Sequence, residues 1–302
     1  MKMSDDFLSD VAAEAMAPAT GPFPHLPFLT AWHEELGGDY AVFTAEWPHG
    51  GVMMMRSSAS GIELLGEPDL TDYHSPLGQL SAADLLGWAK ALPRDRMRLD
   101  SLPIEAAEPL ETALKAAGRA PRVAVHEYAL RVELPATRND FDAMLSKRDR
   151  HELRRKRRRY EDLVGKVALR TEQGEGDAFS EFIRLHRLAA GPKGEFMSGP
   201  RERFFRRLAA QPGWRVDLLE TTSGAAAACL FGFSDGIGYY LYNSSFDPAF
   251  APASPGLVVL TEMIDHVISQ GHQIFDFLKG DEDYKTRLGA GRRPLYVIEV
   301  DA

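Results

Sequence analysis

Residues 276–285 hold a dense set of side chains that can transfer protons, beginning within the apolar strand pattern from Gln273 to Leu278. Tyr284 carries a phenol that can act as a general acid, and Asp276 carries a carboxylate that can bind or deprotonate an amine. Asp276 lies inside the apolar strand, where a carboxylate needs a buried partner such as Lys285. We therefore predict a proton-transfer site in this segment, with Tyr284 and Asp276 as its reacting groups.

Each of these residues also has a purely structural interpretation. Tyr284 could pack a short helix expected over residues 281–288. Asp281 could bind an amine, but a role as the N-cap of that helix is favoured. Lys285 could hold a phosphate or a carboxylate, or it could be an ordinary surface lysine. The sequence leaves these alternatives open.

Tyrosines on a strand expected over residues 237–245 form a second candidate group. Alternation along this strand places Tyr240 and Tyr242 on one face, and Tyr239 and Asn243 on the other. Tyr242 or Asn243 could therefore reach a substrate. The simpler interpretation, which is favoured, is that these residues are half-buried packing residues of a sheet.

The segment Lys147 to Arg159 carries nine Lys or Arg and two acids, a local charge of 9 − 2 = +7 in a chain whose total is −9. Most such segments are solvated helix faces. The charge would also attract polyanions, such as coenzyme A phosphates, a nucleotide-linked or lipid-linked sugar, or RNA. The segment lacks interleaved aromatics, which argues against reading of RNA sequence. We predict that Arg154 to Arg159 border a ligand entrance, with Arg154 binding substrate.

Periodicity and turn signals predict an α/β chain with a mixed sheet in each of two halves. In the first half we expect strands at 40–47, 51–56, 62–65, 97–102 and 123–132, and helices at 81–92 and 105–117. In the second half we expect helices at 141–163, 177–189, 201–210, 257–270 and 281–288, and strands at 214–221, 225–233, 237–245, 273–278 and 295–300. Ser254-Pro255-Gly256 opens the helix at 257–270, with Ser254 as its N-cap.

The element order of residues 214–300 resembles that of the GNAT acyltransferase fold. Ser254-Pro255-Gly256 and the segment Phe275 to Lys285 are similar to the signature of the Fem-like, CelD-type acetyltransferase family, in which two GNAT-like halves occur and the first is usually degenerate. Asp-Tyr-His-Ser-Pro-Leu at 72–77 resembles a loop of that first half. The resemblance covers about residues 25 to 300 and is specific mainly in the last 60 or so.

The resemblance implies an acyl-CoA donor, commonly acetyl-CoA, whose pyrophosphate is held at the start of a central helix. The cofactor-binding candidates that it implies are Phe250, Ser254, Gly256 and Leu257. This loop has one glycine, and its prolines lack N–H donors, so a plain capped helix start is an equal alternative. No metal is implied, and the histidines lack metal-ligand spacing.

The resemblance also implies roles for residues of both halves. Tyr284 would protonate the leaving thiolate, since GNAT enzymes often place a tyrosine there. Tyr73 and His74 of the first-half loop would bind substrate. His186 resembles a histidine often found on the family's second helix, although a packing role is favoured for it.

Composition limits the remaining possibilities. With 44% hydrophobic and 26% charged residues the chain matches globular averages. Its single cysteine, Cys229, cannot form an intramolecular disulfide, and no export signal or span of about 18 apolar residues is visible. We expect a cytoplasmic protein.

The sequence thus predicts a mobile tail at 1–24, a degenerate GNAT-like domain at 25–135 and a GNAT-like acyltransferase domain at 136–302. The favoured function is transfer of an acyl group from acyl-CoA to an amine of a polar molecule, such as a sugar or cell-envelope precursor in exopolysaccharide metabolism. Two alternatives stay open: an aminoacyl-tRNA-dependent Fem-like transferase, because Fem-type relatives use that donor, and a non-catalytic protein that binds a polyanion. DNA binding is not expected, and the oligomeric state is not predicted.

Overall fold

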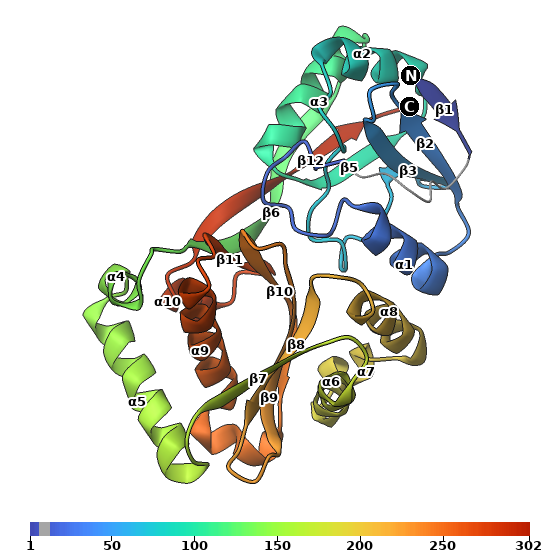
Figure 1. Ribbon diagram of the computed structural model, residues 1–302. Helices are drawn as coiled ribbons and strands as arrows, with labels where there is room; N and C mark the ends of the chain where they lie inside the picture. Colours follow the sequence, from blue (N-terminus) through green and yellow to red (C-terminus); the bar gives the residue numbers. More distant parts are fainter. Residues whose placement is uncertain (6–12) are drawn as a thin grey trace. The chain divides into compact units, whose positions relative to one another are not determined.

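The computed structural model describes residues 1–5 and 13–302. The chain divides into two compact units (Figure 1). Unit 1 comprises Met1–Ala129 and Arg293–Ala302, and unit 2 comprises Leu130–Arg292. Two strands, β6 (Arg122–Glu133) and β12 (Gly291–Val300), contain the points where the chain passes from one unit to the other.

Unit 1 is a mixed sheet with helices packed on it. Its strands follow the order β1-β2-β3-β4-β5-β12, where β4 and β5 are parallel and all other neighbouring pairs are antiparallel. The strands are β1 (Lys2–Ser4), β2 (Ala41–Glu46), β3 (Val52–Ser58), β4 (Gly61–Leu64) and β5 (Met97–Leu102), and the helices are α1 (Leu26–Leu36), α2 (Ala82–Ala91) and α3 (Ile104–Ala116). Leu85, Trp88 and Leu110 of α2 and α3 are buried in one apolar cluster with the sheet.

The segment 1–24 is not the mobile tail that its prolines predicted, as far as the structure describes it. Lys2–Ser4 pairs with β2, and Ala17 and Phe23 are buried. Arg293 explains part of this order, because its guanidinium donates to the carbonyl oxygens of Pro18 and Ala19. Residues 6–12 lie outside the described part.

The last residues differ from the expected domain division in a similar way. Residues 293–302 cluster with unit 1, whereas the sequence placed them in the second domain. The reason is strand pairing, since β12 pairs antiparallel with β5 from Tyr296↔Leu102 to Val300↔Met97.

Unit 2 is built on the strand order β6-β11-β10-β9-β8-β7, with helices on both faces (Figure 1). Its other strands are β7 (Ala168–Gln173), β8 (Trp214–Glu220), β9 (Ala226–Ser234), β10 (Gly238–Phe246) and β11 (Ile274–Lys279). Its helices are α4 (Arg138–Met144), α5 (Lys147–Leu163), α6 (Asp177–Leu188), α7 (Pro192–Phe196), α8 (Gly199–Ala209), the 3₁₀ helix η1 (Pro248–Ala253), α9 (Pro255–Ser269) and α10 (Asp283–Arg287).

Strands β10 and β11 pair over a short stretch and then separate. Their parallel register runs from Gly238↔Ile274 to Tyr240↔Asp276. Beyond it β10 continues to pair with β9 as far as Phe246, so its last residues face β11 without a ladder. This divergence of two parallel strands beyond their paired ends is a feature that open α/β sheets use to admit ligands.

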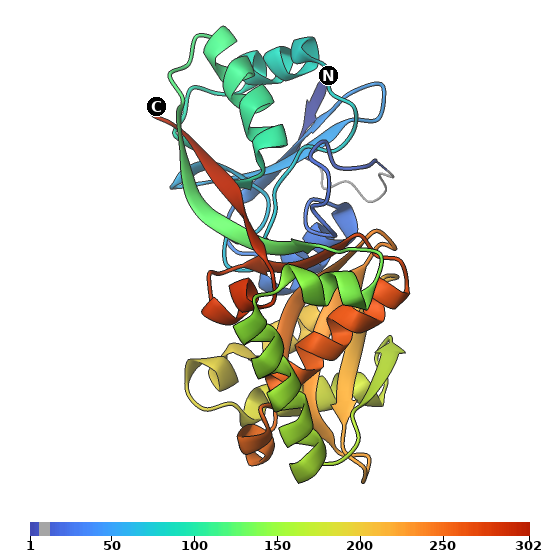
Figure 2. The ribbon, with the colours of Figure 1, turned by 90° about the vertical axis from the view of Figure 1, so that its left-hand side faces the viewer.

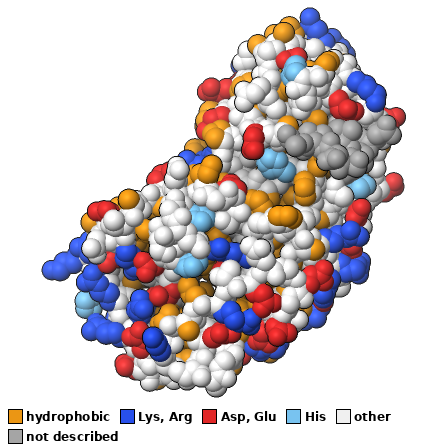
Figure 3. All heavy atoms as spheres, viewed as in Figure 1, with side chains coloured by type: hydrophobic (Ala, Val, Ile, Leu, Met, Phe, Trp, Pro, Cys, Tyr) orange, Lys and Arg blue, Asp and Glu red, His pale blue; other side chains and the backbone are white. Residues whose placement is uncertain are grey.

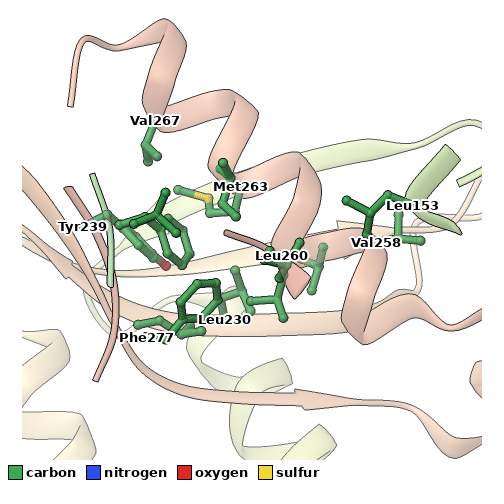
Figure 4. Packing of buried hydrophobic residues seen from close by; sticks show 14 of the residues in the cluster. Leu153, Leu230, Tyr239, Val258, Leu260, Met263, Val267 and Phe277 are labelled. Carbon is green, nitrogen blue, oxygen red and sulfur yellow. The ribbon is translucent and has the colours of Figure 1, made fainter. Parts of the chain in front are cut away.

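Each face of the sheet of unit 2 carries its own apolar core. On one face α9 lies along the strands, with Leu260, Met263 and Val267 directed at Leu230 and Tyr239 (Figure 4). On the opposite face α6 and α8 cover an aromatic cluster made by Phe179, Phe182, Phe205, Trp214, Phe231 and Tyr242. The two faces separate because successive strand residues point in opposite directions.

Helix α5 packs on α9 and carries the basic segment (Figure 2). The expected single helix over 141–163 is interrupted, because Leu145 and Ser146 have extended backbone and Ser146 caps α5 by accepting from the Asp149 N–H. Leu153 and Tyr160 are its buried residues, and Leu153 meets Val258 of α9 (Figure 4). In the described residues, no helix is both long enough and apolar enough to cross a bilayer.

Candidate active site

A cavity of about 530 Å³ lies entirely in unit 2, where β10, α5, α9 and α10 meet. From the predicted site residues it collects Ser254, Gly256, Leu257 and Tyr284. Residues that the sequence did not single out complete its lining: Asp149, Glu152, Leu153, Lys156, Ser244, Phe246, Leu260, Glu282 and Arg287. The cavity therefore joins the predicted helix start and the predicted acid, which are about thirty residues apart in the chain.

The start of α9 provides a polar end to this cavity. Ser254 adopts the left-handed backbone conformation, with φ 57° and ψ 48°, which is costly for a residue with a Cβ. Its hydroxyl does not cap the helix, contrary to expectation; it accepts a hydrogen bond of 2.9 Å from the Lys156 ammonium. The strained turn thus places a hydroxyl and an ammonium together at the first turn of a fifteen-residue helix.

Few backbone N–H groups at this turn can donate a hydrogen bond to a ligand. Pro255 has no N–H, and the amides of Leu257 and Val258 donate to the Ser254 carbonyl oxygen. The Gly256 amide donates no hydrogen bond to another described residue. An anion at this position would meet the Gly256 N–H, the Lys156 charge and the positive end of the helix dipole.

Tyr284 lies on α10 at another part of the cavity. Its ring contacts Phe277 edge to face, at 6.1 Å between ring centroids. Its hydroxyl has no hydrogen-bond partner among residues 1–5 and 13–302. Burial, with a smaller contribution from Glu282, raises the pKa of Tyr284 to about 12. The phenol is therefore protonated at neutral pH and free to donate to a ligand.

Asp276 does not reach this cavity. It is fully buried on β11, and its Oδ1 accepts a 2.7 Å hydrogen bond from the Leu278 N–H. Leu278 has φ 59°, so the carboxylate supports a left-handed turn at the end of the strand. This geometry supports a positioning role for Asp276, and the direct proton transfer expected from the sequence stays a prediction.

Lys285 and Asp281 also have structural contacts. Lys285 is buried, and its ammonium donates to the carbonyl oxygens of Lys279 and Gly280 and pairs with Glu282. These bonds close the turn between β11 and α10, on which Tyr284 is carried. Asp281 is exposed and pairs with Arg292 at 4.0 Å. It does not cap α10, because α10 begins two residues later, and it does not line the cavity.

His186 and Asn243, which were predicted independently, contact each other. The His186 Nε2 lies 2.7 Å from the Asn243 Oδ1, and the His186 ring packs between Phe182 and Phe196. A β-bulge between Leu241 and Asn243 breaks the alternation, so Asn243 faces α6 like Tyr242. Simple alternation had placed the two on opposite faces and is wrong here.

Tyr73 and His74 are buried in unit 1 with structural partners. The Tyr73 ring lies under the Arg293 guanidinium at 5.1 Å. The His74 Nδ1 lies 3.0 Å from the Asp100 carbonyl oxygen, and its Nε2 lies 3.3 Å from that of Leu65. His74 also lines a small cavity of about 10 Å³ in unit 1, and substrate binding by Tyr73 and His74 stays a prediction.

Phe250 and Arg154 lie outside the lining of the cavity. Phe250, in η1, packs against the apolar core of unit 2, and Arg154 pairs with Asp142 at 3.2 Å. The residue of the basic segment that meets the α9 start is Lys156. The predicted entrance segment Arg154 to Arg159 contains Lys156, but the substrate-binding role was assigned to Arg154. A helical period of 3.6 residues places Lys156 on the same face of α5 as Leu153 and Tyr160.

Comparison with known proteins agrees with this geometry. Residues 147–286, which include every residue that lines the cavity except Arg287, match a family model described as "Acetyltransferase (GNAT) domain". The matched segment is similar to an acetyltransferase domain, and together with the fold this match supports an enzyme of the N-acetyltransferase type. A search of the curated proteins finds no match.

Solved structures with low sequence identity share the fold. A conserved protein of unknown function from Bacteroides thetaiotaomicron has a TM-score of 0.63 at 12% identity, covering 97% of this chain and 94% of its own. L-PGS from Bacillus licheniformis has a TM-score of 0.60 at 13% identity, covering 92% of each chain. FemX has a TM-score of 0.58 at 11% identity, covering 92% of this chain and 93% of its own. The chain thus has a mixed α/β fold that is similar to the folds of these proteins and consistent with a tandem GNAT-like arrangement.

Proposed function

We propose that the chain transfers an acyl group from acyl-CoA to an amine of a polar acceptor, with the cavity of unit 2 as its active site. The observation that carries this proposal is the presence in one cavity of an unpartnered, protonated phenol, Tyr284, and a helix start that presents the Lys156 ammonium and the Gly256 N–H. The match of residues 147–286 to a GNAT domain supports it.

In this proposal the donor lies with its pyrophosphate at the start of α9. The Lys156 ammonium and the Gly256 N–H bind phosphate oxygens, and the helix dipole adds to their attraction. The acyl chain extends towards the separated ends of β10 and β11, alongside Ser244 and Phe246.

The reaction requires a neutral amine, cleavage of the thioester bond and protonation of the leaving thiolate. The acceptor amine attacks the thioester carbonyl as its free base, the C–S bond breaks, and the thiolate receives a proton. Tyr284 supplies that proton in our proposal, and the resulting phenolate recovers the proton that the attacking nitrogen releases, directly or through solvent. The turn held by Lys285 and Asp276 fixes the position of Tyr284 without touching the reactants.

The acceptor in the proposal is a polar amine, of the sugar or cell-envelope class implied by the Fem-like resemblance. The strong positive charge of residues 147–159 favours one second candidate, an aminoacyl-tRNA donor in place of acyl-CoA. The two donors predict different binding. Acyl-CoA needs the α9 start, whereas a tRNA would depend on many cations of α5 and on salt.

Calorimetric titration with acetyl-CoA tests the proposal. We expect binding to the wild-type chain and weaker binding to Lys156→Gln, with the exposed Lys166→Gln as a control of equal charge change. Absence of acetyl-CoA binding at millimolar concentration would contradict the acyl-CoA proposal. Salt-sensitive binding of a charged tRNA under those conditions would favour the second candidate.

A further inference from the structure

A second cavity, of about 670 Å³, lies on the α5 side of unit 2. It is lined by Lys147, Arg148, Asp149, His151, Glu152 and Arg287. Asp149, Glu152 and Arg287 also line the cavity that contains Tyr284. The two cavities are therefore neighbours with a shared wall, and Lys and Arg side chains gather along the edge formed by α5 (Figure 3).

The cations of the second cavity are exposed to solvent and have no close side-chain partner in the described part of the chain. In the described part of the chain, Lys147, Arg148, His151 and Arg287 form no ion pair or hydrogen bond through their side chains. Several other cations of α5 are paired, although Arg158 and Arg159 form no ion pair with a described residue. Arg155 bonds Glu152, Arg157 bonds Glu262, and Arg150 donates to two backbone carbonyl oxygens. The unpaired cations of the cavity are concentrated at the first turns of the helix, beside Arg287 of α10.

The two carboxylates in the cavity have other close partners, although Glu152 also attracts the Arg287 charge at longer range. The Asp149 carboxylate accepts from the Ser146 hydroxyl in the helix cap, and Glu152 is held by Arg155. Lys147 and Arg148 also lie in the first turn of α5, where the helix dipole disfavours a positive charge. No ion pair within the described chain offsets this cost, and both side chains are exposed, so a ligand in the cavity can reach their charges.

We propose that the second cavity is a phosphate-binding subsite for a substrate that reaches Tyr284, and this subsite rests on the proposed function. Lys147, Arg148 and Arg287 supply the charge, and His151 adds a ring nitrogen. The pyrophosphate of the donor occupies the α9 start in that function, so this subsite takes a further phosphate. Two sources have this chemistry: the 3′-phosphate of coenzyme A and a phosphate carried by the acceptor amine.

The test compares two double variants that remove the same charge from the same helix. Lys147→Gln with Arg148→Gln alters the second cavity. Arg158→Gln with Arg159→Gln is the control, because both residues are exposed, line neither cavity and form no ion pair with a described residue. Binding is measured by calorimetry at low salt, with acetyl-CoA, acetyl-dephospho-CoA, glucosamine 1-phosphate and glucosamine as probes.

The proposal expects one phosphate-bearing probe to lose roughly tenfold in affinity in the first variant and less than about twofold in the control. A loss with acetyl-CoA but not with acetyl-dephospho-CoA assigns the subsite to the donor. A loss with glucosamine 1-phosphate but not with glucosamine assigns it to the acceptor. Equal losses in both variants, or no loss with any probe, would overturn the subsite.

Failure of the proposed function gives a different result. In that case acetyl-CoA binds none of the proteins, including the wild type. Adenosine 3′,5′-bisphosphate, which lacks the thioester, then tests the subsite alone. The subsite predicts that binding of this bisphosphate weakens in Lys147→Gln with Arg148→Gln and persists in the control. Any other result rejects the subsite proposal.

Discussion

The ammonium nitrogen of Lys156 lies 2.9 Å from the hydroxyl oxygen of Ser254, although the two residues are 98 positions apart. This bond joins the basic helix α5 to the start of α9. The Ser254 hydroxyl does not cap the helix backbone, so the helix start stays available to an anion. The relationship defines the donor end of the proposed active site.

Replacing Lys156 by Gln is expected to weaken acetyl-CoA binding by about three- to tenfold, because one charged phosphate contact is lost. The free energy of unfolding should change by less than about 1 kcal/mol, since Lys156 is partly exposed and its nearest carboxylate, Glu152, is 3.9 Å away. Calorimetry and urea unfolding measure the two quantities. Equal weakening in Lys166→Gln would show that only general charge matters.

Tyr284→Phe is expected to lower kcat by roughly 10² to 10⁴-fold with little change in KM for the acyl donor, because the leaving thiolate loses its acid. Tyr160→Phe is the matched control. Its pKa is also raised to about 12 by burial, but its hydroxyl contacts the Glu220 carbonyl oxygen and it does not line the cavity. If Tyr284→Phe unfolds more easily and keeps its turnover, Tyr284 is a packing residue.

The stability of the wild type is expected to fall as pH rises from about 10 to 12. The folded pKa of Tyr284, about 12, exceeds the unfolded value of 10.0, so the unfolded state loses its proton first and unfolding becomes easier in that window. Tyr284→Phe should reduce this pH-dependent loss by about 1–2 kcal/mol. Urea unfolding at pH 9 and pH 11 measures it, and an identical pH slope in both proteins would contradict the burial of the phenol.

Asn243→Ala is expected to destabilise unit 2 by about 1–3 kcal/mol, because the buried His186 ring loses its hydrogen-bond partner. Acetyl-CoA affinity should stay within about twofold of the wild type. Thermal unfolding and calorimetry separate the two effects. A higher KM for the acceptor without a loss of stability would restore the substrate-binding role that the sequence suggested.

Ser254→Gly and Ser254→Val should differ in stability by about 1–3 kcal/mol, with Val the less stable. Position 254 has φ 57°, which glycine adopts freely and a β-branched residue does not. Both variants lose the hydroxyl, so the comparison isolates the backbone conformation. Equal stabilities would show that the turn relaxes to another conformation in the variants.

The sequence by itself determined the mixed α/β fold class of unit 2 and most of its elements. Strands 214–221, 225–233 and 237–245 and the helix opened by Pro255 agree with β8, β9, β10 and α9 to within a few residues. These elements have strong local signals: apolar alternation, glycine turns and a proline at the first helical position. The placing of Tyr284 after a strand followed from the same order.

Weaker local signals left other elements unpredicted. The helix α1 was not anticipated. The edge strand β7 and the short strand β1 were also not anticipated, because such strands owe their structure to pairing partners distant in the sequence. The β-bulge at Tyr242 was missed for the same reason, and with it the direction of Asn243.

The partners of polar side chains were decided only by tertiary structure. Sequence could name Asp276, Lys285 and Ser254 as chemically capable, but not that the first two hold a turn while the third accepts from Lys156. It could count the charges of residues 147–159, but not separate the paired arginines from the unpaired cations near Arg287. These hydrogen bonds and ion pairs depend on distances of a few ångströms between segments far apart in the chain. Local periodicity of the sequence does not determine those distances.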